Sequence, residues 1–120
     1  MRPQSNAFLI AADRALSDAR LAYYAEFHAA QTLIFERTGR IAKTHKGVGK
    51  QFHGLAKAEP SFPANLAAEL SSTYRYKEFA DYDTVQATPI TAVQATGAIA
   101  TAERFVAAVR HALASPPGVP

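Results

Sequence analysis

Residues 9–35, LIAADRALSDARLAYYAEFHAAQTLIF, decide the fold of this chain. Apolar side chains recur in this stretch at spacings of three and four residues, the repeat of one face of an α-helix. The stripe consists of Leu9, Ala12, Leu16, Ala19, Tyr23, Phe27, Ala30 and Ile34. It predicts about seven turns of helix, either as one helix or as two that join near Ser17 and Asp18. Ser5 or Asn6 is the expected N-cap, and Gly39 is the expected stop.

Three more helices are expected downstream. Residues 45–56 form an amphipathic segment that Thr44 is suited to cap. After a break at residues 59–63, a helix is expected from Pro63 to about Ala80, followed by a loop over residues 81–89. The last helix should begin near Thr88 or Thr91 and bury a stripe of Ile99, Ala102, Val106, Val109 and Leu113. The pattern predicts an all-α protein, an up-and-down bundle of four to five helices.

Length and composition favour one domain over residues 1–120, with about 6–113 structured and 114–120 as a flexible tail. The chain has no cysteine, which excludes disulfides and thiol catalysis. No apolar run approaches the roughly 18 residues of a membrane span, and the first residues make a poor signal peptide. We therefore expect a cytoplasmic protein that does not engage a membrane.

Positive charge is concentrated in one segment. Six basic residues and no acidic residue lie between Arg37 and Lys57, whereas the rest of the chain carries seven basic and ten acidic residues. A basic strip shares one side of the expected helix at residues 45–56: Lys46, Lys50, His53 and Lys57. The strip indicates either an anionic partner at this place or a solvated basic surface.

Four segments, in this order, resemble the HEPN family of small bacterial and archaeal helical proteins. They are Tyr23-Tyr24-Ala25-Glu26-Phe27-His28-Ala29-Ala30, Lys43-Thr44-His45-Lys46-Gly47-Val48, Arg75 with Ala80-Asp81-Tyr82, and Ala102-Glu103-Arg104-Phe105-Val106. The resemblance covers about residues 15–113 and implies a helical bundle that usually forms a homodimer. It also implies a minimal nucleotidyltransferase as a partner in a toxin–antitoxin pair. In such pairs the HEPN protein can be a ribonuclease toxin that AMP transfer to a tyrosine silences, and other members bind nucleotides or the nucleotidyltransferase.

The chain departs from the nuclease members of that family at one position. Those members carry an arginine, four to six further residues and then a histidine, whereas here Arg75 is followed after five residues by Asp81. An aspartate does not provide near-neutral acid–base chemistry unless its pKa is strongly raised. The N-terminal part of the chain also differs from that of the family. Only 22 residues precede Tyr23, so the first helix is expected to be short or to be completed across a dimer.

The resemblance makes Arg75 and Asp81 the candidate catalytic residues and Tyr82 a candidate acceptor for modification. The guanidinium of Arg75 either holds a phosphate or pairs with Glu78 at the surface.

A second group of candidates lies at the start of the 45–56 helix, where free N–H groups favour an anion. These candidate phosphate ligands are Lys43, Thr44, His45, Lys46 and Lys50. His45 has two further interpretations, a local hydrogen bond at the helix start or a catalytic role with Arg40.

Tyr24 and His28 are secondary candidates, and His28 is expected either to bond across helices or to take part in catalysis. The histidines do not cluster at ligand spacing, and no phosphate-binding glycine motif is present, so we expect neither a metal nor a cofactor.

Two functions follow from these residues. The first is a catalytically inert module that binds a nucleotide or a nucleotidyltransferase partner, and Asp81 favours it. The alternative is a metal-independent ribonuclease toxin that cleaves RNA through a composite site at a dimer interface.

Overall fold

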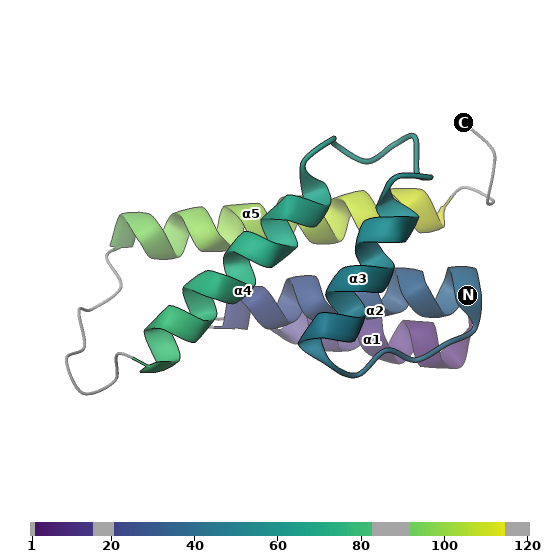
Figure 1. Ribbon diagram of the computed structural model, residues 1–120, viewed down its shortest axis with the longest axis horizontal. Coiled ribbons are helices and arrows are strands. Elements are labelled where there is room, and N and C mark those ends of the chain that lie inside the picture. Colours follow the sequence, from purple (N-terminus) through teal and green to yellow (C-terminus); the bar gives the residue numbers. More distant parts are fainter. Residues whose placement is uncertain (1, 16–20, 83–91, 115–120) are drawn as a thin grey trace.

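The computed structural model describes residues 2–15, 21–82 and 92–114, without the side chains of residues 14, 15, 76, 78–82 and 92–95. These ranges form five helices and no strand, which confirms the expected all-α bundle. The helices are α1 (Pro3–Ala15), α2 (Ala22–Thr38), α3 (His45–Ala56), α4 (Leu66–Tyr82) and α5 (Ala92–Leu113). Successive helices α1, α2, α4 and α5 alternate in direction, while α3 crosses α2 (Figure 1). No helix in the described ranges is long and apolar enough to span a bilayer.

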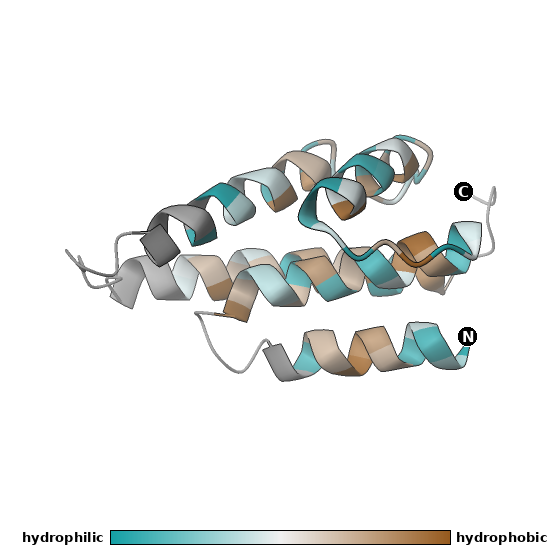
Figure 2. Ribbon diagram, turned by 60° about the horizontal axis from the view of Figure 1, so that its bottom comes forward, coloured by the Kyte–Doolittle hydropathy of each residue, from teal (hydrophilic) through white to brown (hydrophobic). Residues whose placement is uncertain are grey.

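Helix α2 is the centre of the bundle. It lies beside α5, with α1 covering one side of this pair and α3 and α4 covering the other (Figure 2). Every residue from Ala29 to Ile34 is consequently buried. A helix with one apolar face would alternate between buried and exposed positions, so this unbroken burial reflects neighbours on every side of α2.

The stretch that carries the long apolar stripe forms two helices, α1 and α2, and the residues between them (16–20) lie outside the described ranges. The chain becomes helical at Pro3, earlier than the expected start near residue 6. Proline suits a first turn because its missing N–H would have no acceptor there. Ser5 therefore lies inside α1 and is fully buried, so the expected cap at Ser5 or Asn6 is wrong.

Glycine ends α2 as expected. Gly39 adopts φ 73°, and its N–H donates to the Phe35 carbonyl oxygen at 2.8 Å. The buried Gln31 amide then donates to the Ala42 carbonyl oxygen at 2.9 Å and ties the following loop to α2. This bond fixes where the chain enters α3.

Helix α3 has the expected bounds, and the Phe52 ring anchors it in the core, 5.0 Å from the Phe105 ring of α5 between centroids. Helix α4 continues to Tyr82, so the loop expected over residues 81–89 is wrong for its first two residues, and the others lie outside the described ranges. No glycine or proline stands between Pro63 and Pro89 to end it sooner. In α5 the stripe faces the core as predicted, with Ala102, Val106 and Val109 buried and Ile99 and Leu113 half-buried. Residues 115–120, part of the expected tail, lie outside the described ranges.

Candidate functional site

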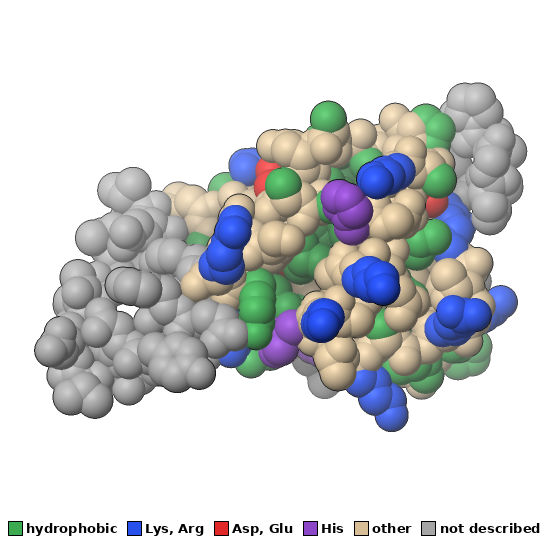
Figure 3. Space-filling model, in the orientation of Figure 1, with side chains coloured by type: hydrophobic (Ala, Val, Ile, Leu, Met, Phe, Trp, Pro, Cys, Tyr) green, Lys and Arg blue, Asp and Glu red, His purple; other side chains and the backbone are tan. Residues whose placement is uncertain are grey.

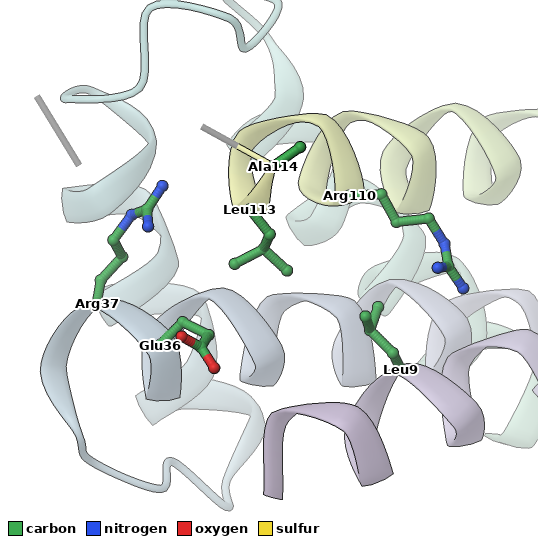
Figure 4. Close-up of a pocket in the computed structure, with 6 residues that line it drawn as sticks. All are labelled: Leu9, Glu36, Arg37, Arg110, Leu113 and Ala114. Atoms are coloured by element: carbon green, nitrogen blue, oxygen red, sulfur yellow. The ribbon is translucent and has the colours of Figure 1, made fainter. Parts of the chain in front are cut away.

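One pocket lies where α1, α2 and the end of α5 meet (Figure 4). Its lining residues are Leu9, Glu36, Arg37, Arg110, Leu113 and Ala114. Each charged group there already has a partner. The Arg37 guanidinium binds Glu59 at 2.8 Å, Arg110 binds Asp13 at 2.6 Å, and Glu36 accepts a hydrogen bond from the Arg2 backbone N–H at 2.9 Å. These pairs make the pocket a poor receptor for a charged ligand.

A second pocket, here called the α3–α4 pocket, has a volume of about 360 Å³, within the range of small-ligand sites. It opens between α3 and α4 over the start of α2. Its lining residues are Tyr23, His45, Lys46, Gly49, Lys50, Leu70, Ser71, Tyr74 and Arg75. Four of the predicted site residues, His45, Lys46, Lys50 and Arg75, therefore come together, although about 30 residues separate the α3 group from Arg75 in the chain.

The described residues that line the α3–α4 pocket include three positively charged side chains and no acidic one. Lys46 and Lys50 stand one turn apart on α3, Arg75 faces them from α4, and all three side chains are exposed. Lysine and arginine side chains are spread over this face of the molecule, which shows little acidic surface (Figure 3). Cations that converge on a hollow attract anions more strongly than the same charges on an open surface.

Aromatic rings form the other wall of the pocket. The buried Tyr23 hydroxyl is 2.7 Å from His45 Nδ1, and the His45 ring stacks on Tyr74 with centroids 4.5 Å apart and planes 28° apart. The Tyr23 and Tyr74 centroids are 5.3 Å apart. The local hydrogen bond considered for His45 is thus replaced by contacts with α2 and α4, which hold its imidazole at the pocket wall.

Helix α3 begins at the edge of this pocket, since its first two residues, His45 and Lys46, are among the lining residues. The Thr44 hydroxyl accepts a hydrogen bond from the Gly47 N–H at 2.9 Å, which confirms Thr44 as the N-cap. His45 and Lys46 are the first two residues of the helix, so their N–H groups have no acceptor within it. Lys43 and Thr44 are themselves exposed and do not line the pocket.

Replacing Thr44 with alanine should destabilise the protein by about 1 kcal/mol, because the Gly47 N–H loses its acceptor. Thr44→Ser keeps the hydroxyl and should retain nearly all the stability. Urea unfolding of the three proteins measures the difference. A Thr44→Ser protein as unstable as Thr44→Ala would show that the hydroxyl does not cap α3.

Two acidic side chains, Glu26 of α2 and Glu69 of α4, act on each other. Glu26 is fully buried, and neither of its carboxyl oxygens has a hydrogen-bond partner among the described residues. Burial raises the pKa of Glu26 to about 8, and the Glu69 carboxylate adds to this rise. Glu26 is therefore neutral near pH 7, unlike the usual glutamate.

The remaining predicted residues lie elsewhere. Tyr24 is half-buried, with the Lys77 ammonium 5.5 Å from its ring centroid. His28 bonds within its own helix, through Nδ1 to Gln31 Oε1 at 2.8 Å, so the bond expected across helices is not the one formed. The Gln31 amide nitrogen donates to the Ala42 carbonyl oxygen, so the Gln31 side-chain oxygen is the atom that faces His28. Because an amide oxygen can only accept, His28 Nδ1 carries the proton.

The backbones of Asp81 and Tyr82 belong to α4, but their side chains lie outside the described part of the structure, as does that of Glu78. Their predicted roles, and the proposed Arg75–Glu78 pair, remain predictions. Arg40 is exposed and is not among the residues that line either pocket. Within the described ranges, no group of three or more histidine, cysteine, aspartate or glutamate residues is arranged to hold a metal ion.

Neither spacing nor composition indicated the aromatic wall. Tyr23 was assigned to the core, which is correct for its burial but incomplete, because it also lines the pocket. Tyr74 was not singled out at all. Its position directly before Arg75 was the available signal, since adjacent helix residues lie about 100° apart and can border one hollow.

Comparison with protein families gives one match. The model of the HEPN domain matches residues 4–112 of the 120 residues. No curated protein matches the chain.

Proposed function

The chain belongs to the HEPN domain family, and we propose that it is a binding module whose α3–α4 pocket receives the phosphate of a nucleotide. The family is associated with nucleotides and RNA. The observation that carries the proposal is the convergence of Lys46, Lys50 and Arg75 on one pocket beside His45 and the start of α3. Charge-assisted hydrogen bonds from these groups favour a phosphate over a carboxylate, because a phosphate presents three oxygens to them.

The aromatic wall supports a nucleotide over inorganic phosphate. Tyr74 is half-buried and presents part of its ring to the pocket, beside the His45 imidazole. Flat aromatic groups pack well on such rings. The phosphate would lie between Lys46, Lys50 and Arg75, and the base would lie toward Tyr74.

The test is calorimetric titration of the protein with AMP, adenosine and inorganic phosphate at one ionic strength. AMP should bind saturably and at least tenfold more tightly than either adenosine or phosphate, since each of these lacks one half of the recognised group. Equal affinity for AMP and adenosine, or no saturable binding of AMP at millimolar concentration, would overturn the proposal.

The proposed module would act in a toxin–antitoxin-like pair with a minimal nucleotidyltransferase. HEPN domains commonly dimerise, and we propose that this chain works as a homodimer. The basic strip on α3 supports a partner with an acidic surface, because its lysines are exposed on one face. AMP transfer to Tyr82 would appear as a gain of one AMP in intact mass after incubation with the nucleotidyltransferase and ATP, and would be lost in Tyr82→Phe.

The second candidate is a ribonuclease toxin that uses a composite site at the dimer interface. The basic strip favours it, since the exposed Lys46, Lys50, His53 and Lys57 extend from the pocket along α3 at turn spacing. Such a row can contact successive phosphates of one RNA strand. Structured RNA incubated with the protein in EDTA should then be cleaved, and Arg75→Ala should abolish the cleavage. Intact RNA, together with normal growth on expression, would exclude the toxin.

A further inference from the structure

We propose that Glu26 and Glu69 form a proton-controlled latch between α2 and α4, so that loss of the Glu26 proton releases α4 from the bundle. The latch is independent of which ligand the α3–α4 pocket binds. It is a property of two acidic side chains, Glu26 of α2 and Glu69 of α4, whose carboxyl groups are buried and act on each other.

The burial of these carboxyl groups favours keeping a proton on Glu26. Glu26 has no exposed surface, and both of its oxygens are without a hydrogen-bond partner in the described part of the chain. Glu69 belongs to α4, and one of its carboxyl oxygens is likewise buried and without a partner among the described residues. The hydroxyl of Thr73, beside them, donates to the Glu69 backbone carbonyl at 2.8 Å. Ionising Glu26 would therefore leave a buried charge without a hydrogen-bond donor and repelled by Glu69.

No described cation relieves this repulsion. The ionisable groups on the other helices around α2 are engaged at the periphery or exposed to solvent. On α1, Asp13 pairs with Arg110 of α5. On α3, His45 contacts Tyr23, and Lys46 and Lys50 are exposed at the pocket.

On α5, the side chains of Glu103, Arg104 and His111 are exposed. On α4, Arg75 is exposed and Lys77 lies over the ring of Tyr24. Among all of them, Glu69 is the charged group that acts on Glu26.

Helix α4 is the helix that we expect to separate from the bundle. Of its described side chains only Leu66 and Leu70 are buried, whereas α5 buries five: Ala102, Phe105, Val106, Val109 and Ala112. Helix α4 packs on α3 and α2 and touches α5 only lightly. Elements with few buried apolar contacts open at the lowest free-energy cost.

Release of α4 would also open the pocket. Tyr74 and Arg75 follow Thr73 directly in α4, and both line the pocket opposite His45 and Lys46. Moving α4 away from Glu26 therefore separates the two walls that hold the ligand.

Proton linkage fixes the pH range in which the latch works. The closed state keeps Glu26 protonated up to about pH 8, whereas a solvated glutamate has an ordinary pKa of 4.5. Opening then releases one proton at any pH between these values. The equilibrium constant for opening should rise by up to about tenfold per pH unit in this interval and become constant above it.

Hydrogen exchange of the whole chain, read as protection factors with the intrinsic pH dependence removed, tests the latch. Between pH 6 and 8 the α4 amides should lose at least about tenfold in protection, while staying less protected than the α2 amides. Glu26→Gln, which cannot ionise, should remove this pH dependence. Glu36→Gln is the matched control on the same helix and should retain it.

Three outcomes would overturn the latch. The first is α4 protection in the unmodified protein that does not change with pH. The second is an undiminished loss of protection in Glu26→Gln. The third is equal protection of α4 and α2 at every pH, which would mean that Glu26 acts on the whole fold and that α4 does not open by itself.

Discussion

Replacing Glu26 with methionine should raise the free energy of unfolding by about 3–5 kcal/mol at pH 8, and by much less at pH 5. Methionine has a similar volume and fills the space without a polar group to desolvate. In the unmodified protein, Glu26 binds its proton in the folded state up to about pH 8 and loses it near pH 4.5 when exposed. The unfolded state therefore binds fewer protons between these values, so the glutamate lowers stability progressively as pH rises.

Urea unfolding at pH 5, 6, 7 and 8 measures this effect. The difference between the two proteins isolates Glu26, because the other titrating groups are common to both. Glu26→Gln should likewise lose the pH dependence but gain less stability, since a buried amide without partners remains costly. A stability difference that is the same at all four pH values would show that Glu26 is ionised, or solvated, in the folded protein.

Removing two charges from the α3–α4 pocket should weaken AMP binding by about 100-fold, in the double variant Lys46→Ala with Arg75→Ala. A hydrogen bond to a charged group contributes about 1.5–3 kcal/mol, and each 1.4 kcal/mol is a factor of ten in affinity. Both side chains are exposed, so their removal should leave folding intact.

The matched control removes the same net charge outside the pocket, with Arg40→Ala and Lys57→Ala. Both residues are exposed and neither lines the pocket. This control should weaken AMP binding less than about threefold at 0.15 M salt, where distant charges are screened. Equal losses in the two double variants would mean that AMP responds to the overall charge of the protein and has no specific site in the pocket.

Local signals in the sequence predicted the helices well. Thr44 and Gly39 mark helix ends through their own conformation, so the start of α3 and the end of α2 were predicted correctly. Ser5 failed as a cap because Pro3 had already begun α1, and the serine hydroxyl is buried inside the helix. Periodicity alone also left open whether residues 9–35 form one helix or two, because the stripe has the same spacing in α1 and α2.

The pocket was predicted in part. Its cations stood out because a basic segment is visible in composition, and the family resemblance pointed to Arg75. That His45 would bond to Tyr23 and stack on Tyr74 depends on how three helices cross, and neither spacing nor composition contains this information.

The burial of Glu26 could not be predicted from the sequence, for a different reason. A charged residue beside an apolar stripe normally faces solvent. It is buried here because α2 has helices on every side, which only the assembled bundle reveals.

The most direct test of the proposed nucleotide site is an NMR titration of the isotopically labelled protein with AMP, followed through the backbone amides. If AMP binds in the α3–α4 pocket, the amide shifts should saturate with one dissociation constant. They should be centred on His45, Lys46, Gly49, Ser71 and Arg75. Absence of saturable shifts, or shifts centred instead on Leu9, Glu36 and Leu113 at the other pocket, would contradict it.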